Sequence, residues 1–105
     1  MSVAAANLCL QRALALVDHA LSEAEQGAWH RVAELDARCR DASKEMAREL
    51  EGHDLGPLLL QGCVELRERH RRLVELAEQH RDRLARERRE SRRGREGARA
   101  YANST

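Results

Sequence analysis

The stretch that decides the fold is EQGAWHRVAELDARCR, from Glu25 to Arg40, which contains the only tryptophan of the chain. Trp29 lies two residues after Gly27, and glycine commonly ends helices. Apolar residues then recur at the three- and four-residue steps of a helix face: Val32, Leu35 and Cys39. The stretch predicts that one helix ends and another begins here. Trp29 is expected to pack where the two helix ends meet, with contact to a bound partner as its alternative role.

Apolar stripes on both sides of this corner define the first two helices. The first is expected over about 7–26, with Asn7 as its N-cap. Its stripe consists of Leu10, Leu14, Val17, Leu21 and Ala24, widened on one flank by Ala13, Leu16 and Ala20. The second is expected over about 28–51, until Gly52 closes it. The stripe of the first helix is wide enough to contact two neighbouring helices.

A third and longer helix is expected after the turn EGHDLGP, over about 56–92, because Pro57 suits the first turn of a helix. Its apolar stripe contains Leu59, Cys63, Leu66, His70, Leu73, Ala77, His80 and Leu84. Beyond it, Gly94 and Gly97 are expected to interrupt the chain before a short C-terminal helix over about 94–102. The sequence therefore predicts an all-α fold: an elongated antiparallel three-helix bundle with a short C-terminal helix, in a single domain over 1–105.

Charge is distributed unevenly in this chain of 105 residues, although the formal net charge is only +1. Residues 1–66 carry six basic and eleven acidic groups, whereas residues 67–105 carry thirteen arginines and seven acids. Acids interleave with the arginines from Arg81 to Arg99 and no aromatic stacking residues accompany them. A solvated helix face is therefore expected there, with direct nucleic-acid binding as the disfavoured alternative.

Several classes of function are disfavoured by motifs that the sequence lacks. It contains no HExxH, GxSxG, P-loop or GxGxxG pattern, so no enzymatic activity and no cofactor is expected. Cys9, Cys39 and Cys63 form no CxxC pair, which predicts reduced thiols without a metal site. No apolar run approaches the length of a membrane span, and a cytoplasmic protein without membrane contact is expected.

The two histidines of the third stripe, His70 and His80, are ten residues apart, too far for the i, i+4 spacing of a helical metal pair. They are expected to be hydrogen-bonded or half-exposed packing residues, with partner contact or pH sensing as alternatives. A small helical bundle with spare apolar surface is typical of proteins that bind a helix in a groove, or of modules that self-associate. Partner binding is therefore the leading class.

Three elements of the sequence resemble the FliT-type flagellar export chaperones, which escort the filament-cap protein. The first is a leading amphipathic helix that ends in Gly27-Ala28-Trp29 and is followed by Val32-x-x-Leu35-x-x-Arg38. The second is the long helix from Leu66 to Leu84 after a Gly/Pro turn. The third is the C-terminal stretch RRGREGARAY, which ends at Tyr101. His30 departs from the acidic residue that many relatives carry after the tryptophan.

The resemblance implies a cytoplasmic chaperone of the flagellar type III export pathway. It would bind the C-terminal segment of the cap protein, prevent premature assembly and deliver its client to the export apparatus. A flagellar transcription regulator and a second copy of the chain are further partners that stay open. The alternative is a coiled-coil adaptor or self-associating structural protein with no role in export.

The resemblance also implies which residues bind the client and which residues regulate that binding. A client cleft between the second and third helices would be formed by Leu35, Cys39, Met46, Leu66, Leu73, Leu76 and Ala77. The C-terminal segment would fold back over this cleft as a regulatory cover, lined by Ala98, Ala100, Tyr101 and Ala102.

Overall fold

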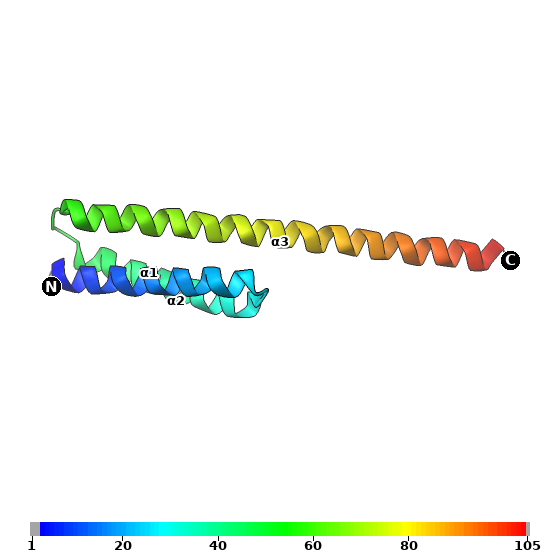
Figure 1. The fold of residues 1–105 in the computed structure, drawn as a ribbon, viewed down its shortest axis with the longest axis horizontal. Coiled ribbons are helices and arrows are strands. Elements are labelled where there is room, and N and C mark those ends of the chain that lie inside the picture. The colour runs from blue at the N-terminus through cyan, green and yellow to red at the C-terminus, as the bar shows by residue number, and fades with distance from the viewer. Residues whose placement is uncertain (1–2, 105) are drawn as a thin grey trace. The chain divides into compact units, whose positions relative to one another are not determined.

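The computed structural model describes residues 3–104, and these residues form three α-helices and no strand (Figure 1). The helices are α1 (Val3–Glu25), α2 (Trp29–Glu49) and α3 (Pro57–Ser104). The prediction of an all-α fold is confirmed. By packing, the chain divides into two units, Met1–Val74 and Glu75–Thr105, which are described separately. That residues 1–105 fold as a single domain stays a prediction.

The corner between α1 and α2 has the form that the opening stretch predicts. Gly27 has a φ of 77°, a left-handed conformation that favours glycine. The Ala28 amide donates to the Glu23 carbonyl at 2.9 Å, and the Gly27 amide donates to the Ala24 carbonyl at 3.1 Å. These two bonds make the Schellman motif that ends many helices. Trp29 is the first residue of α2 and its side chain is half-buried.

The beginning of α1 differs from the prediction, because Asn7 lies inside the helix and does not cap it. The helix already includes Val3 and continues through Ala4, Ala5 and Ala6. Alanine has the highest intrinsic helix propensity. The run of alanines therefore extends the helix upstream of the first apolar stripe residue, Leu10.

The tightest packing in the first unit is between α1 and α2. Ala6, Ala13 and Ala20 are fully buried and recur every seven residues along α1. Such small side chains let the α2 backbone approach closely, and the thiol of Cys39 donates to the carbonyl oxygen of Ala13 at 3.5 Å. In the described helices, Cα atoms of α1 and α2 come within 8 Å of each other.

The first part of α3, residues 57–74, packs on this pair with fewer side chains. Leu59, Leu66 and Leu73 are its three buried residues, again at seven-residue steps. Gly62 lies against the side chain of Leu10. This contact brings the two helices close together at the Gly62–Leu10 position.

Contacts between side chains give the relative directions of the three helices. Arg69 donates to Asp18 of α1 at 2.9 Å, and the His70 ring lies 3.0 Å from Asp36 of α2. Because Gly62 contacts Leu10 and Arg69 contacts Asp18, the first part of α3 runs parallel to α1 and antiparallel to α2. The predicted antiparallel three-helix arrangement is therefore present in the first unit.

The short C-terminal helix predicted over 94–102 is wrong, because α3 continues without interruption from Pro57 to Ser104. Neither Gly94 nor Gly97 has a positive φ. A glycine inside a helix costs only about 1 kcal/mol relative to alanine, whereas a proline would break it. Arginine and glutamate, which are good helix formers, surround both glycines.

Candidate functional site

The candidate site is a groove between α2 and the first part of α3, with a volume of about 290 Å³. We call it the α2–α3 groove. Its floor contains the apolar side chains of Cys39, Met46, Cys63 and Leu66. Its remaining lining residues are polar: Arg40, Ser43, Arg67 and His70.

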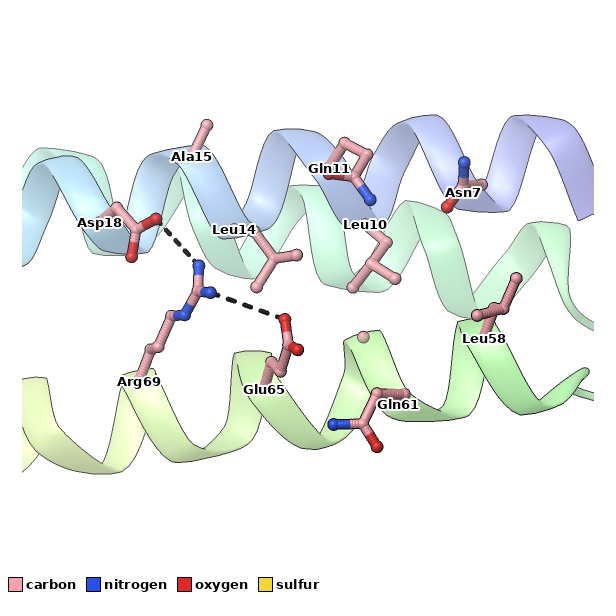
Figure 2. A pocket seen from close by; sticks show the side chains of 11 residues that line it. Asn7, Leu10, Gln11, Leu14, Ala15, Asp18, Leu58, Gln61, Glu65 and Arg69 are labelled. Carbon is pink, nitrogen blue, oxygen red and sulfur yellow. Dashed lines mark hydrogen bonds and ion pairs between the residues drawn. The ribbon is translucent and has the colours of Figure 1, made fainter.

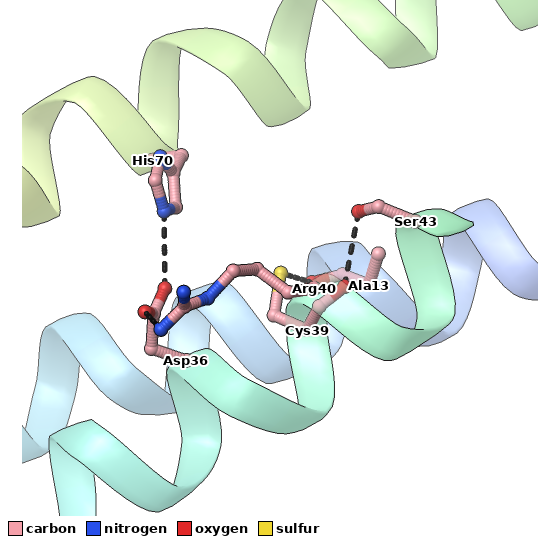
Figure 3. Close-up of polar contacts among 6 residues, drawn as sticks. All are labelled: Ala13, Asp36, Cys39, Arg40, Ser43 and His70. Carbon is pink, nitrogen blue, oxygen red and sulfur yellow. Dashed lines mark hydrogen bonds and ion pairs between the residues drawn. The ribbon is translucent and has the colours of Figure 1, made fainter. Parts of the chain in front are cut away.

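Asp36 contacts two residues of the polar rim, Arg40 and His70 (Figure 3). One carboxylate oxygen accepts from Arg40 at 2.8 Å, and the other lies 3.0 Å from the Nε2 atom of His70. The prediction that His70 is a hydrogen-bonded, half-exposed residue is confirmed, since its side chain is 40% exposed. Arg67 makes no ion pair with another residue of the described chain, so its charge is open to a ligand of the groove.

The two cysteines of the groove floor remain thiols in the structure. Burial, with a smaller effect of the nearby Asp36 carboxylate, raises the pKa of the Cys39 thiol above its ordinary value of 9.0, although the Ser43 hydroxyl opposes this. Burial also raises the pKa of the Cys63 thiol. At neutral pH both side chains therefore act as small apolar groups.

The structure brings together only part of the predicted client-binding set. Cys39, Met46 and Leu66 line the α2–α3 groove. Leu35 and Leu73 are buried in the core of the first unit and do not line it. Leu76, which is half-buried, and Ala77, which is exposed, belong to the second unit.

Sequence reasoning did not select the polar members of the groove. Arg40 directly follows Cys39 and Arg67 directly follows Leu66. Residues next to a stripe on a helix lie at its edge, which is the available signal for them. Cys63 and His70 were assigned to the third stripe but not to the site.

The four residues predicted as a regulatory cover lie in the last turns of α3. Ala98, Ala100, Tyr101 and Ala102 are all exposed, and the Tyr101 side chain is 74% exposed. Their place in an uninterrupted helix means that a fold-back would require α3 to open.

A second groove, of about 630 Å³, lies between α1 and the first part of α3 (Figure 2). Leu10, Leu14 and Leu58 contribute apolar surface to it. Its rim is occupied by Arg69, which donates to Asp18 at 2.9 Å and lies 3.6 Å from Glu65. The arginine of this groove is therefore paired internally, whereas Arg67 of the α2–α3 groove makes no ion pair with a described residue, so the α2–α3 groove is the better candidate for a partner.

No helix within 3–104 is sufficiently long and hydrophobic to span a membrane. In the same range, no cluster of three or more His, Cys, Asp or Glu side chains is placed to hold a metal ion.

A protein-family model described as flagellar protein FliT matches residues 9–103. No curated protein and no solved structure matches the chain significantly.

Proposed function

Since the chain belongs to the FliT family of flagellar export chaperones, we propose that its α2–α3 groove binds the C-terminal segment of the filament-cap protein. In this proposal the chain is a cytoplasmic protein without catalytic activity. It keeps its client unassembled and delivers it to the flagellar export apparatus. The observation that carries the proposal is the groove itself, because its apolar floor and polar rim lie between the two helices that the resemblance implicates.

The chemistry of the groove fits an amphipathic helix as ligand. Apolar side chains of the client would contact Met46, Cys63 and Leu66, which reproduces the helix-in-groove mode of recognition. Acidic side chains of the client would pair with Arg67, which makes no ion pair with any residue that the structure describes. Methionine adapts to irregular apolar ligands because its side chain is flexible.

The test is titration of the chain with a peptide that covers the C-terminal segment of the cap protein. Cys63→Trp fills the groove, and Val64→Trp places the same ring on the next residue, which is 49% exposed and does not line the groove. We expect Cys63→Trp to weaken binding about tenfold or more, a loss of about 1.4 kcal/mol, while Val64→Trp stays within threefold.

Thermal unfolding of both variants controls for a damaged fold. Equal affinities of the wild type and Cys63→Trp, with both proteins folded, would place the client elsewhere. No binding of the peptide to the wild-type chain would contradict the client assignment itself.

The proposed regulatory cover has its own test. If Ala98, Ala100, Tyr101 and Ala102 compete with the client, deletion of residues from 95 onward leaves the helicity of the first unit intact and tightens peptide binding, or at least does not abolish it. Complete loss of binding on this deletion would refute the cover.

A self-associating adaptor is the alternative function, because the exposed fractions of Leu58 and Tyr101 are 88% and 74%. Sedimentation at tens of micromolar separates the two hypotheses. A monomer would count strongly against self-association, whereas a stable dimer without affinity for the cap-protein peptide would favour it.

A further inference from the structure

The second unit carries a face of arginines that the proposed groove does not use. In residues 75–104 every described side chain except those of Glu75, Leu76 and His80 is exposed. At 3.6 residues per turn, five arginines fall within an arc of about 60° on one side of α3. We call these residues the arginine face: Arg81, Arg88, Arg92, Arg95 and Arg99.

Within residues 3–104, none of these five guanidinium groups has a partner. The arginine face makes no ion pair and no side-chain hydrogen bond with another described residue. In the first unit, by contrast, Arg40 pairs with Asp36 and Arg69 pairs with Asp18. The positive charge of the arginine face is therefore available to another molecule.

The spacing of the arginine face matches contact with a second helix. Arg81, Arg88 and Arg95 recur every seven residues, and the small or apolar residues between them complete alternating steps of three and four: Leu84, Ser91, Ala98 and Ala102. This is the pattern by which one helix lies along another. Serine and alanine at the intervening positions allow close approach of a partner backbone.

The flanks of the arginine face favour carboxylates over phosphates as its ligands. Glu96 and Glu87 border the arc, and Asp82 and Glu90 lie on the remaining sides of the helix. A helix inside a nucleic-acid groove has phosphates on both sides, so these acids would be repelled. A partner that touches only the arginine face avoids them, and arginine binds carboxylates in bidentate pairs.

A second copy of the chain is a poorer match, because many of its described acids are already paired. Six carboxylates of the first unit form ion pairs with its own basic side chains: Asp18, Glu23, Asp36, Glu45, Glu65 and Glu68. Along α2, Arg38 and Arg48 lie on the same side as Glu34 and Asp41, two of the three acids of this helix without an ion pair among the described residues; the third is Glu49.

We propose that the arginine face binds an acidic α-helix of another protein, lengthwise along α3 from Arg81 to Arg99. This contact covers about 27 Å of helix. It is separate from the α2–α3 groove and does not depend on the nature of the client. Long-range attraction would speed the encounter, and bidentate pairs would fix the register.

The experiment titrates the full chain with three labelled probes. The first is a helical peptide of about 21 residues with glutamates along one face at alternating steps of three and four. The second has the same composition with its glutamates spread around the helix, and the third is duplex DNA. We expect the first peptide to bind about tenfold more tightly than the second, and more tightly than DNA.

Two quadruple variants with the same change of charge then locate the contact. One replaces Arg88, Arg92, Arg95 and Arg99 with glutamine. The other replaces the same number of arginines outside the arginine face: Arg83, Arg86, Arg89 and Arg93. Glutamine is a good helix former, so circular dichroism should show helicity preserved in both. We expect the first variant to lose about tenfold in affinity for the one-face peptide, and the second less than threefold.

Three results would overturn the proposal. Equal losses in the two variants would show that net charge alone attracts the peptide. Equal affinity for the two peptides would show that binding does not depend on glutamates lying along one face of the partner helix. Tighter binding of DNA than of either peptide would assign the arginine face to nucleic acid.

Discussion

Trp29 is the largest side chain of the chain, and its contribution depends on its half-buried place at the α1–α2 corner. Fully buried aromatic side chains cost about 3–5 kcal/mol when truncated to alanine. We expect Trp29→Ala to lower the free energy of unfolding by about 1–3 kcal/mol, because only part of the ring leaves water on folding. Urea unfolding measures this. Trp29→Phe, which keeps most of the apolar area, should cost less than half as much, and an unchanged stability of Trp29→Ala would assign the ring to a partner or to solvent.

Cys39 and Cys63 make the stability of the chain sensitive to alkaline pH. Burial raises the pKa of both thiols in the folded protein, so above the ordinary value of 9.0 the unfolded chain loses these protons first. The folded state then binds more protons than the unfolded state, and the free energy of unfolding decreases as the pH rises. The stabilisation is fully present below pH 9.0 and is lost as the pH passes through the raised values.

Urea unfolding between neutral pH and about pH 10.5 checks this prediction. A Cys39→Ala, Cys63→Ala variant should show a smaller decrease across the same window, since the two titrating groups are gone. An identical pH dependence of wild type and variant would mean that other groups govern alkaline stability.

At the scale of the element, α3 contains two glycines that should respond oppositely to alanine. A Cβ at Gly62 would collide with the side chain of Leu10, which is 1% exposed. Nothing lies within 4 Å of a Cβ placed on Gly97. We expect Gly62→Ala to destabilise the first unit by about 1–3 kcal/mol through overpacking.

Gly97→Ala is the matched control. We expect it to stabilise the helical state of α3 locally by about 1 kcal/mol and so to increase helicity. Thermal unfolding followed by circular dichroism measures both variants. Equal effects of the two substitutions would show that Leu10 does not confine Gly62.

The individual elements were predictable to different degrees. The end of α1 and the start of α3 follow from single residues, Gly27 and Pro57, whose backbone preferences act locally. Neither the first residues of α1 nor the continuity of α3 was predicted. Helix propensity extended α1 through its alanines, and it outweighed the modest cost of Gly94 and Gly97 in α3.

At the scale of the whole molecule, amide protection should differ strongly between its parts. The core of the first unit is formed by buried residues of all three helices, whereas residues 75–104 contribute no buried side chain. Amides protected by tertiary packing exchange only on global unfolding, while an exposed helix frays. We expect the amides of α1 and α2 to exchange at least about 100-fold more slowly than those of residues 81–104.

Hydrogen exchange followed by mass spectrometry or NMR tests this. Equal protection along the full length of α3 would show that its second part is covered in solution. Loss of that protection in the arginine-to-glutamine variants would then identify the arginine face as the covered surface.

The candidate site was predictable only where it coincides with the apolar stripes. Cys39, Met46 and Leu66 lie on the stripes of their helices, so periodicity already selects them. Arg40, Ser43 and Arg67 carry no such signal, because charged and hydroxyl residues occupy most of the solvent-facing positions. Only the packing of α3 against α2 distinguishes the few that border the groove.

By itself the sequence determined the helical class, the three apolar stripes and the turn chemistry at Gly27 and Pro57, because each of these depends on residues within a few positions of one another. Tertiary structure alone decided which of these side chains meet across the helices. The fully buried Ala6, Ala13 and Ala20 permit close contact between α1 and α2, while Leu59, Leu66 and Leu73 pack the first part of α3 on that pair. The α2–α3 groove is a product of this packing, because it depends on which side chains meet across helices far apart in the chain.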